Sequence, residues 1–200
     1  MRFAPTSFRP LFGRILSVVV AVVCAGGIAS FAIAGDVDGL VRYSWPLLLI
    51  AVLVFTLYFR PSLDVAEHEV TVRNPFVTVH VPWPAIERVD TKWALTLFTA
   101  DGKITAWASP APNRYAAHVT PNVDTRLAAR DGGTSVRPGD LPNTSSGAPA
   151  LVIRSHFEEL RETGLLDAGV EPGTLRREVH WGTVATLGAL VLLTVLGATL

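Results

Sequence analysis

The 200-residue sequence predicts an α+β membrane protein: two N-terminal transmembrane helices and one C-terminal transmembrane helix flank a small antiparallel β-sheet covered by an amphipathic helix. Three observations predict this fold class. Three apolar stretches contain no charged residue and approach the roughly 20 residues that a spanning helix needs. Between the second and third stretches, β-branched and aromatic residues alternate with polar ones at the period of a strand. A segment with helical periodicity follows this β-rich region.

The predicted transmembrane helices span residues 15–35, 43–59 and 181–200. Each length falls within the roughly 17 to 25 residues that membrane helices use. Aromatic rings and arginines at the ends of such helices reach the headgroup layer. The predicted interface anchors are Tyr43, Trp45, Arg60, Arg176, Arg177 and Trp181. Because the third stretch ends at the chain terminus, a segment lying along the membrane surface is the alternative there.

Arginines are distributed unevenly around these stretches. Residues 1–14 carry three of them, Arg60 follows the second stretch and Arg176-Arg177 precede the third, whereas residues 36–42 have a single basic residue. Cytoplasmic flanks carry the excess of Lys and Arg. We therefore expect a multi-pass protein of the cell membrane, with residues 1–14 and the β-rich region in the cytoplasm. The short loop 36–42 and the C-terminus are expected outside.

A cleaved signal peptide is the competing interpretation of the first stretch. Ala32-Ile33-Ala34 has the small-x-small form that signal peptidases accept, but the apolar run is longer than the roughly 7 to 15 residues of a signal-peptide core. Cys24 is the only cysteine, so no internal disulfide can form, which suits a reducing compartment.

Residues 60–109 predict an antiparallel meander of five or six short strands. The expected strands are residues 65–72 (one strand or a pair), 76–81, 86–92, 94–99 and 103–109. Asn74-Pro75 predicts a turn, and Asp101-Gly102 predicts a tight hairpin. Pro82 and Pro84 stop the ladder, because proline donates no backbone hydrogen bond.

Residues 110–148 are rich in Pro, Gly, Asn, Asp and Ser and predict a flexible loop. Residues 149–166 then predict an amphipathic helix that covers the sheet, with Ile153, Phe157 and Leu160 on its apolar stripe and Gly164 as its stop. Residues 167–180 are the predicted linker to the third transmembrane helix.

Several of these pieces occur in an order that resembles a known family. The run Arg73-Asn-Pro-Phe-Val-Thr-Val-His-Val-Pro-Trp83 precedes Ile86-Glu-Arg-Val89, and the hairpin Leu95–Gly102 precedes Ala106-Trp-Ala108 and the closing helix. With the two membrane helices, they resemble actinobacterial membrane proteins that carry a bacterial PH-like domain of the low-molecular-weight protein antigen type. The resemblance covers residues 63–109, and agreement is weaker up to residue 166. It implies a strongly bent antiparallel sheet capped by the C-terminal helix, but no activity, because such a fold hosts many binding roles.

Charge argues against two classes of ligand. PH domains of the best-known kind bind phosphoinositides through Lys and Arg between their first two strands, whereas residues 63–69 contain three acidic residues and no basic one. Residues 60–178 carry 13 Lys and Arg against 15 Asp and Glu, a net charge of −2. A polybasic patch, which contributes about 1 kcal/mol per cation at an anionic membrane, is therefore not visible. The same balance argues against nucleic acid as a partner.

The sequence contains no recognisable catalytic or metal-binding constellation. The five histidines lack metal-ligand spacing, and no nucleophile–base pair or phosphate-binding glycine loop stands out. We therefore expect no enzyme activity, no metal site and no cofactor. Trp83, Trp93 and Trp107 are the candidate binding residues, as the lining or rim of a ligand groove; packing in the core or at its rim is the alternative.

These observations predict a non-catalytic, membrane-anchored PH-like module that binds or scaffolds an unidentified membrane or cytoplasmic protein at the cytoplasmic face. An exposed sheet edge and the groove between sheet and helix are the expected docking surfaces, and homo-oligomerisation is left open. The first alternative is a protein that binds or senses lipid. The second is an accessory subunit of a transporter or of an envelope-synthesis complex.

Overall fold

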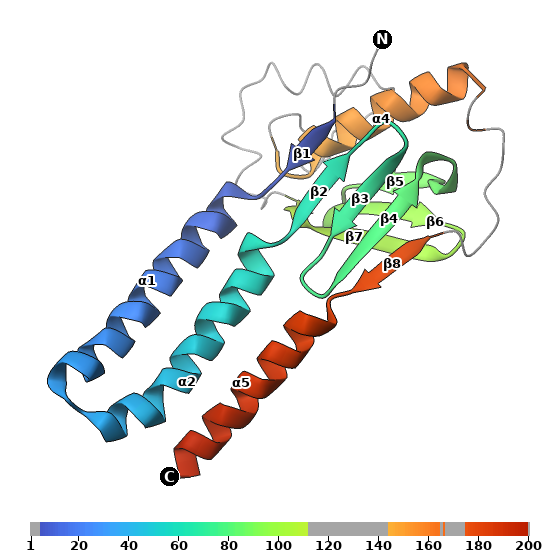
Figure 1. Cartoon of the computed structure of the whole chain (residues 1–200). Coiled ribbons are helices and arrows are strands. Elements are labelled where there is room, and N and C mark those ends of the chain that lie inside the picture. Colours follow the sequence, from blue (N-terminus) through green and yellow to red (C-terminus); the bar gives the residue numbers. More distant parts are fainter. Residues whose placement is uncertain (1–4, 112–143, 165, 167–174, 200) are drawn as a thin grey trace. The chain divides into compact units, whose positions relative to one another are not determined.

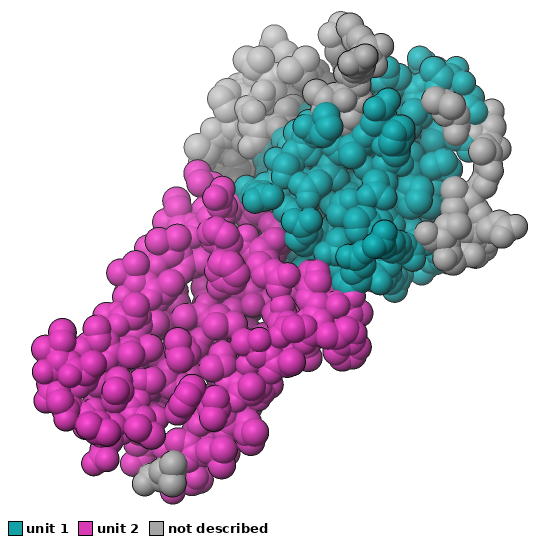
Figure 2. All heavy atoms as spheres, in the orientation of Figure 1, with its two compact units in different colours: residues 1–9, 62–74, 78–178 teal, residues 10–61, 75–77, 179–200 magenta. Residues whose placement is uncertain are grey.

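The computed structural model describes residues 5–111, 144–164, 166 and 175–199 (Figure 1). The chain divides into two compact units (Figure 2): residues 1–9, 62–74 and 78–178 form the sheet unit, and residues 10–61, 75–77 and 179–200 form the helical unit. Most of the predicted loop 110–148 and linker 167–180 lies outside the described residues.

The larger sheet has five strands in the order β1-β2-β3-β4-β8. They are β1 Thr6–Phe8, β2 Ser62–Val65, β3 Glu69–Arg73, β4 Val77–Pro82 and β8 Arg176–Val179. The predicted strand 65–72 is a pair: β2 and β3 run antiparallel, with Leu63 opposite Val72. Because side chains alternate between the faces of a strand, Val70 and Val72 both point into the core and are fully buried.

Two strands of this sheet come from segments that were predicted without regular structure. β1 belongs to the predicted N-terminal segment 1–14 and pairs antiparallel with β2. β8 belongs to the predicted linker 167–180 and lies beside β4. Both segments are too short to show a period-two pattern, so their pairing depends on the neighbouring strand. The edges of β2 and β4 are therefore covered, by β1 and β8.

The smaller sheet has the order β5-β6-β7, with β5 Arg88–Asp90, β6 Ala94–Thr99 and β7 Gly102–Pro110. Gly102 has φ +114°, which suits glycine alone, and closes the hairpin between β6 and β7. A short 3-10 turn, η2 Trp83–Ala85, replaces the ladder at the two prolines between the sheets. β5 ends before the predicted boundary because the Asp90 carboxylate accepts bonds from the amides of Thr91 and Lys92 and turns the chain.

Helix α4 spans Gly147–Glu162, so it begins and ends earlier than the predicted 149–166. The Thr144 hydroxyl accepts the Gly147 amide at 2.9 Å and caps the start. Gly164, with φ +71°, follows the end in the left-handed conformation.

The buried side of α4 differs in part from the predicted stripe. Ala150 and Ile153 are fully buried, but Phe157 and Leu160 are only half-buried. His156 takes the next buried position because its ring packs edge-on against Trp83, with 4.8 Å between the ring centroids. The helix thus turns a mixed face toward the sheets and leaves Phe157 at its margin.

The helical unit contains α1 Leu11–Ala34, α2 Val37–Val54 continued by the π-helix η1 Phe55–Phe59, and α5 Trp181–Thr199. These three apolar helices, of 24, 23 and 19 residues, are long enough to cross a bilayer. The chain is therefore a multi-pass membrane protein of the predicted α+β class, with α2 contacting both α1 and α5.

The predicted loop 36–42 is wrong, because α2 already begins at Val37. Gly35 ends α1 in the left-handed conformation, with φ +68°. The Asp36 carboxylate then accepts the Gly39 amide at 2.8 Å and caps α2. Because the end of α1 and the cap of α2 are adjacent, the connector consists only of Gly35 and Asp36.

Close contacts join the three helices. A Cβ on Gly13 would lie 2.6 Å from the Tyr58 carbonyl oxygen, so only glycine fits where α1 meets η1. Among the predicted anchors, Arg60 donates to the Thr183 hydroxyl and Trp45 packs beside Gly197, so both also join helices.

The remaining predicted anchors are more exposed. Tyr43 stacks on Phe31 at 5.6 Å, and Trp181 is 73% exposed. Arg176 pairs with Glu178 on β8, and Arg177 is exposed. Their placement at the headgroups remains a prediction.

Candidate functional site

The three candidate tryptophans do not share one groove. Trp83 is 2% exposed, and its indole N–H donates to the Ala66 carbonyl at 3.0 Å, so it belongs to the core. Trp93 and Trp107 are 79% and 54% exposed. Trp107 lies on the outer face of β7, where alternate residues are exposed. The packing alternative therefore holds for Trp83, and the search for a docking surface moves to the sheet edges.

The outer edges of the larger sheet are poor docking sites. β1 has only three residues. β8 carries Arg176, Arg177 and Glu178, and charged side chains on an edge strand discourage the addition of another strand.

The β7 edge of the smaller sheet is bonded by one side chain. The Asn74 amide nitrogen donates to the Thr105 carbonyl at 2.9 Å, and its amide oxygen accepts from the Trp107 N–H at 2.9 Å. A residue of a neighbouring antiparallel strand would make the same pair of bonds. Asn74 thus closes this stretch of β7.

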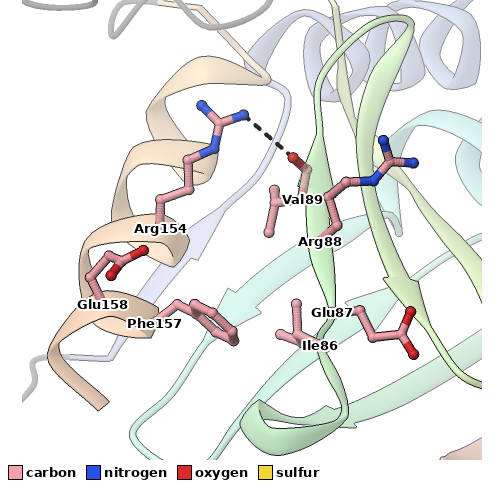
Figure 3. Close-up of a pocket in the computed structure, with 7 residues that line it drawn as sticks. All are labelled: Ile86, Glu87, Arg88, Val89, Arg154, Phe157 and Glu158. Atoms are coloured by element: carbon pink, nitrogen blue, oxygen red, sulfur yellow. Dashed lines mark hydrogen bonds between the residues drawn. The ribbon is translucent and has the colours of Figure 1, made fainter. Parts of the chain in front are cut away.

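The β5 edge lies beside α4 and borders a pocket of about 140 Å³. Figure 3 shows the lining side chains, which come from the β5 segment and from one side of α4. They are Ile86, Glu87, Arg88, Val89, Arg154, Phe157 and Glu158. We call this site the β5–α4 groove.

The backbone of Val89 faces this groove. Its carbonyl accepts from the Arg154 guanidinium at 3.5 Å (Figure 3), so the carbonyl points toward α4. The N–H and C=O of one residue in an antiparallel strand point to the same side. The Val89 N–H therefore also points away from β6. The Val89 backbone thus borders the groove, and its carbonyl is bonded to Arg154 across it.

The pairing of β5 with β6 is irregular where β5 begins. Arg88 is paired with Phe98, and the preceding Glu87 N–H also donates to the Phe98 carbonyl, at 2.8 Å. Two residues thus face one partner residue, the arrangement of a β-bulge, which re-aims side chains and ends regular pairing. The bulge explains why β5 begins at Arg88 and not at the predicted residue 86. Arg88 is steadied by the Phe98 ring, 4.1 Å from its guanidinium carbon.

The charged lining residues border the groove in different directions. In Figure 3 the Arg154 guanidinium lies near Val89, the Arg88 and Glu87 side chains extend away from α4, and the Glu158 carboxylate lies on the side of α4 turned away from β5. Ile86 is 3% exposed and lies across the groove from the half-buried Phe157. The sequence had pointed to a groove between sheet and helix, but not to these charged residues.

A second polar cluster lies on the larger sheet. Glu69 Oε1 accepts from the Thr71 hydroxyl at 3.0 Å and is 2.7 Å from His80 Nδ1. The His80 hydrogen bond is the main cause that holds the pKa of Glu69 below its usual value; burial opposes it, and Thr71 and Arg176 add to it. The cluster links β3, β4 and β8. Within the described ranges, no group of three or more His, Cys, Asp or Glu could hold a metal ion.

Comparison with known proteins identifies the sheet unit. A family model described as "Bacterial PH domain" matches residues 60–150, which run from just before β2 into α4. The predicted PH-like domain is thereby confirmed, whereas the actinobacterial antigen type remains a prediction. No curated protein and no solved structure gives a significant match. The strands β1 and β8 and the membrane helices α1 and α5 lie outside the matched residues.

Proposed function

We propose that this chain is a membrane-anchored binding module that docks an extended segment of another protein along β5, in the β5–α4 groove. We further propose that the sheet unit faces the cytoplasm, as the distribution of arginines favours. The backbone of Val89, turned toward a groove, is the observation that carries the proposal. A segment laid along β5 would bond to this backbone and place alternate side chains in the groove, the mode called β-augmentation.

The size of the groove favours a protein segment over a small molecule or an acyl chain. Pockets for drug-sized ligands measure about 300–1,000 Å³. The β5–α4 groove holds about 140 Å³, close to the roughly 150 Å³ engineered cavity that accepts benzene. It therefore has room for one apolar side chain of a peptide.

The short edge predicts a weak interaction. A few main-chain hydrogen bonds contribute about 0.5–1.5 kcal/mol each, and one buried apolar side chain contributes about 1.5–3 kcal/mol. The sum corresponds to a Kd between roughly millimolar and micromolar. Confinement to one membrane raises effective concentration to about the millimolar range. A partner that is itself membrane-bound fits this affinity best.

Site-specific photo-crosslinking in intact membranes tests the proposal. A photoreactive amino acid replaces Phe157 in the full-length chain, and the matched control replaces Trp107, which is also an exposed aromatic residue. We expect one discrete protein adduct from position 157 and none of that mass from position 107. Equal adduct patterns at the two positions, or no protein adduct at position 157, would contradict docking at the groove.

A second candidate function is contact with lipid, favoured by the exposed tryptophans. The Lys92 ammonium lies 5.8 Å from the centre of the Trp93 ring, and paired aromatic and basic side chains are typical of membrane interfaces. Fluorescence of the protein in vesicles that contain brominated lipid tests this function. Less quenching in the Trp93→Phe and Trp107→Phe variants than in the wild type would favour it, and unchanged quenching would exclude it for these two residues.

A further inference from the structure

We infer that the tip of the β3–β4 hairpin couples the start of helix α5 to the edge of β7. The hairpin tip comprises residues 74–76, between β3 and β4. Phe76 at one end of the tip is bonded to the residue before α5, and Asn74 at the other end is bonded to β7. The α5 contact thereby stabilises the closed β7 edge, and its release opens that edge. This conformational coupling is independent of docking at β5.

His180, directly before α5, holds the hairpin tip. Its backbone N–H donates to the Phe76 carbonyl at 2.9 Å, and its ring Nδ1 lies 3.3 Å from the Pro75 carbonyl oxygen. The His180 carbonyl accepts from the amides of Thr183 and Val184 at 2.9 and 3.2 Å, so the same residue begins the helix. The Phe76 side chain is 41% exposed and adds little packing. A shift of the α5 start therefore acts directly on the carbonyls of the hairpin tip.

The hairpin tip is stiff between its two sets of bonds. Pro75 is buried, and its ring fixes its φ angle. A residue before proline is largely restricted to extended conformations, so Asn74 is restricted as well. The backbone from Asn74 to Pro75 thus has few alternative conformations. For this reason, movement of the Phe76 carbonyl is passed on to Asn74 and is not absorbed between them.

Asn74 carries the effect to β7. Its side chain makes both edge bonds, to the Thr105 carbonyl and from the Trp107 N–H, and each is 2.9 Å long. Hydrogen bonds weaken steeply as they lose alignment, and one rigid amide group makes both of these bonds. Displacement of the hairpin tip therefore loses the two bonds together. The edge then presents a carbonyl and an N–H, the groups through which a further strand adds to a sheet.

Residue-resolved hydrogen exchange of the full-length chain in detergent tests the inference. His180→Pro removes the N–H that donates to Phe76, whereas His180→Ala removes only the ring contact with Pro75. Both variants keep the His180 carbonyl that begins α5. We expect the Trp107 amide to exchange roughly 2- to 12-fold faster in His180→Pro, as the loss of one net hydrogen bond predicts. The acceleration in His180→Ala should be smaller.

Two controls separate this coupling from a general loss of stability. The Ala66 amide donates to the Glu69 carbonyl at 3.0 Å in the turn between β2 and β3, and it should keep its wild-type exchange rate. Thr186→Val changes α5 one turn beyond its first residues, where the Thr186 hydroxyl donates to the Gly182 carbonyl at 2.8 Å. This variant should leave the exchange of the Trp107 amide unchanged.

Coupling is reciprocal, so Asn74→Ala should speed exchange of the His180 amide by a similar factor. This second measurement decides the matter if His180→Pro fails to fold, which thermal unfolding detects. Wild-type exchange of Trp107 in a folded His180→Pro protein, or of His180 in Asn74→Ala, would overturn the inference. Equal acceleration of Trp107 and Ala66 would do the same, because it would indicate general destabilisation. Each of these results leaves the proposed docking at the β5–α4 groove standing.

Discussion

The two edge strands of the smaller sheet, β7 and β5, differ in the side chains that bond to their backbones. At β7, one side-chain amide from Asn74 bonds to the backbone of both Thr105 and Trp107. At β5, the Val89 backbone faces a groove and is bonded there by an arginine at 3.5 Å. Strand edges are aggregation-prone and proteins normally blunt them. The comparison teaches that closing a short edge takes a single residue, so the edge that borders a groove is the place to look for binding.

The largest expected effect comes from weakening the packing of α4, the helix that forms one wall of the groove. Ile153 of α4 is fully buried. Ile153→Ala should lower the free energy of unfolding by about 2–5 kcal/mol, the usual cost of a cavity at a well-packed site. Chemical denaturation of the full-length protein in detergent measures this change. Phe157→Ala is the matched control on the same helix, because Phe157 is half-buried and lines the groove.

We expect Phe157→Ala to abolish docking of the partner segment at the β5–α4 groove while costing less than half as much stability as Ile153→Ala. Equal losses of stability would show that Phe157 supports the fold and does not serve mainly as groove lining.

The next largest effect comes from removing the side chain that closes the β7 edge. Asn74→Ala removes both bonds to β7 and should destabilise the sheet unit by about 1–3 kcal/mol. Hydrogen exchange measures the local part: the Trp107 amide, which donates to Asn74 at 2.9 Å, should exchange faster in the variant. Asn74→Asp keeps the acceptor for Trp107 but loses the donor to Thr105, so it should protect the Trp107 amide and cost about half as much. Unchanged exchange in Asn74→Ala would contradict the closure of this edge.

The sequence predicts the membrane helices and the central strands well but does not predict which edges are closed. Residues 94–99 carry an alternating pattern within one short segment, and β6 has the same bounds. The three membrane helices are likewise predictable from local sequence, because a membrane helix is recognised by its length and composition.

Closure depends instead on contacts between distant residues. Asn74-Pro75 is recognisable as a turn, but the bonds of Asn74 reach residues 31 and 33 positions away, which no local pattern encodes. The tryptophans show the same limit. Trp83 and Trp93 are 2% and 79% exposed although their sequence contexts gave them the same expected role. Among the groove residues, Phe157 was expected on the apolar stripe. Arg154 and Glu158 line the groove only because α4 packs beside β5, which no local pattern predicts.

A smaller effect concerns the covered edge of β4. The pKa of Glu69 is held below its usual value, mainly by the His80 hydrogen bond, so the ionised form is favoured in the folded state. The resulting stability is fully present above the unfolded-state pKa of about 4.5 and is lost as the pH falls through the lower folded-state pKa. The Glu69 side chain is 39% exposed, so we expect at most about 1 kcal/mol.

Thermal unfolding from pH 7 to pH 3 measures this contribution. The wild type should lose stability below about pH 4.5 more steeply than Glu69→Gln, which cannot ionise. Parallel curves for the two proteins would show that the cluster makes no net contribution. Glu67→Gln is the matched control, since Glu67 lies in the exposed turn before β3, and it should follow the wild type.

The smallest expected effect lies on β7 itself and separates the closed edge from the core beneath it. Ser109 is fully buried, and its hydroxyl has no hydrogen-bond partner among the residues that the structure describes. A buried hydroxyl without a partner is costly, whereas an alanine of nearly the same size avoids that cost. Ser109→Ala should therefore raise the stability of the sheet unit by up to about 1 kcal/mol, measured by denaturation beside Asn74→Ala. Because the substitution leaves the Asn74 bonds intact, Trp107 exchange through local opening should stay at the wild-type rate. A destabilised Ser109→Ala protein would mean that the hydroxyl is satisfied in the folded chain.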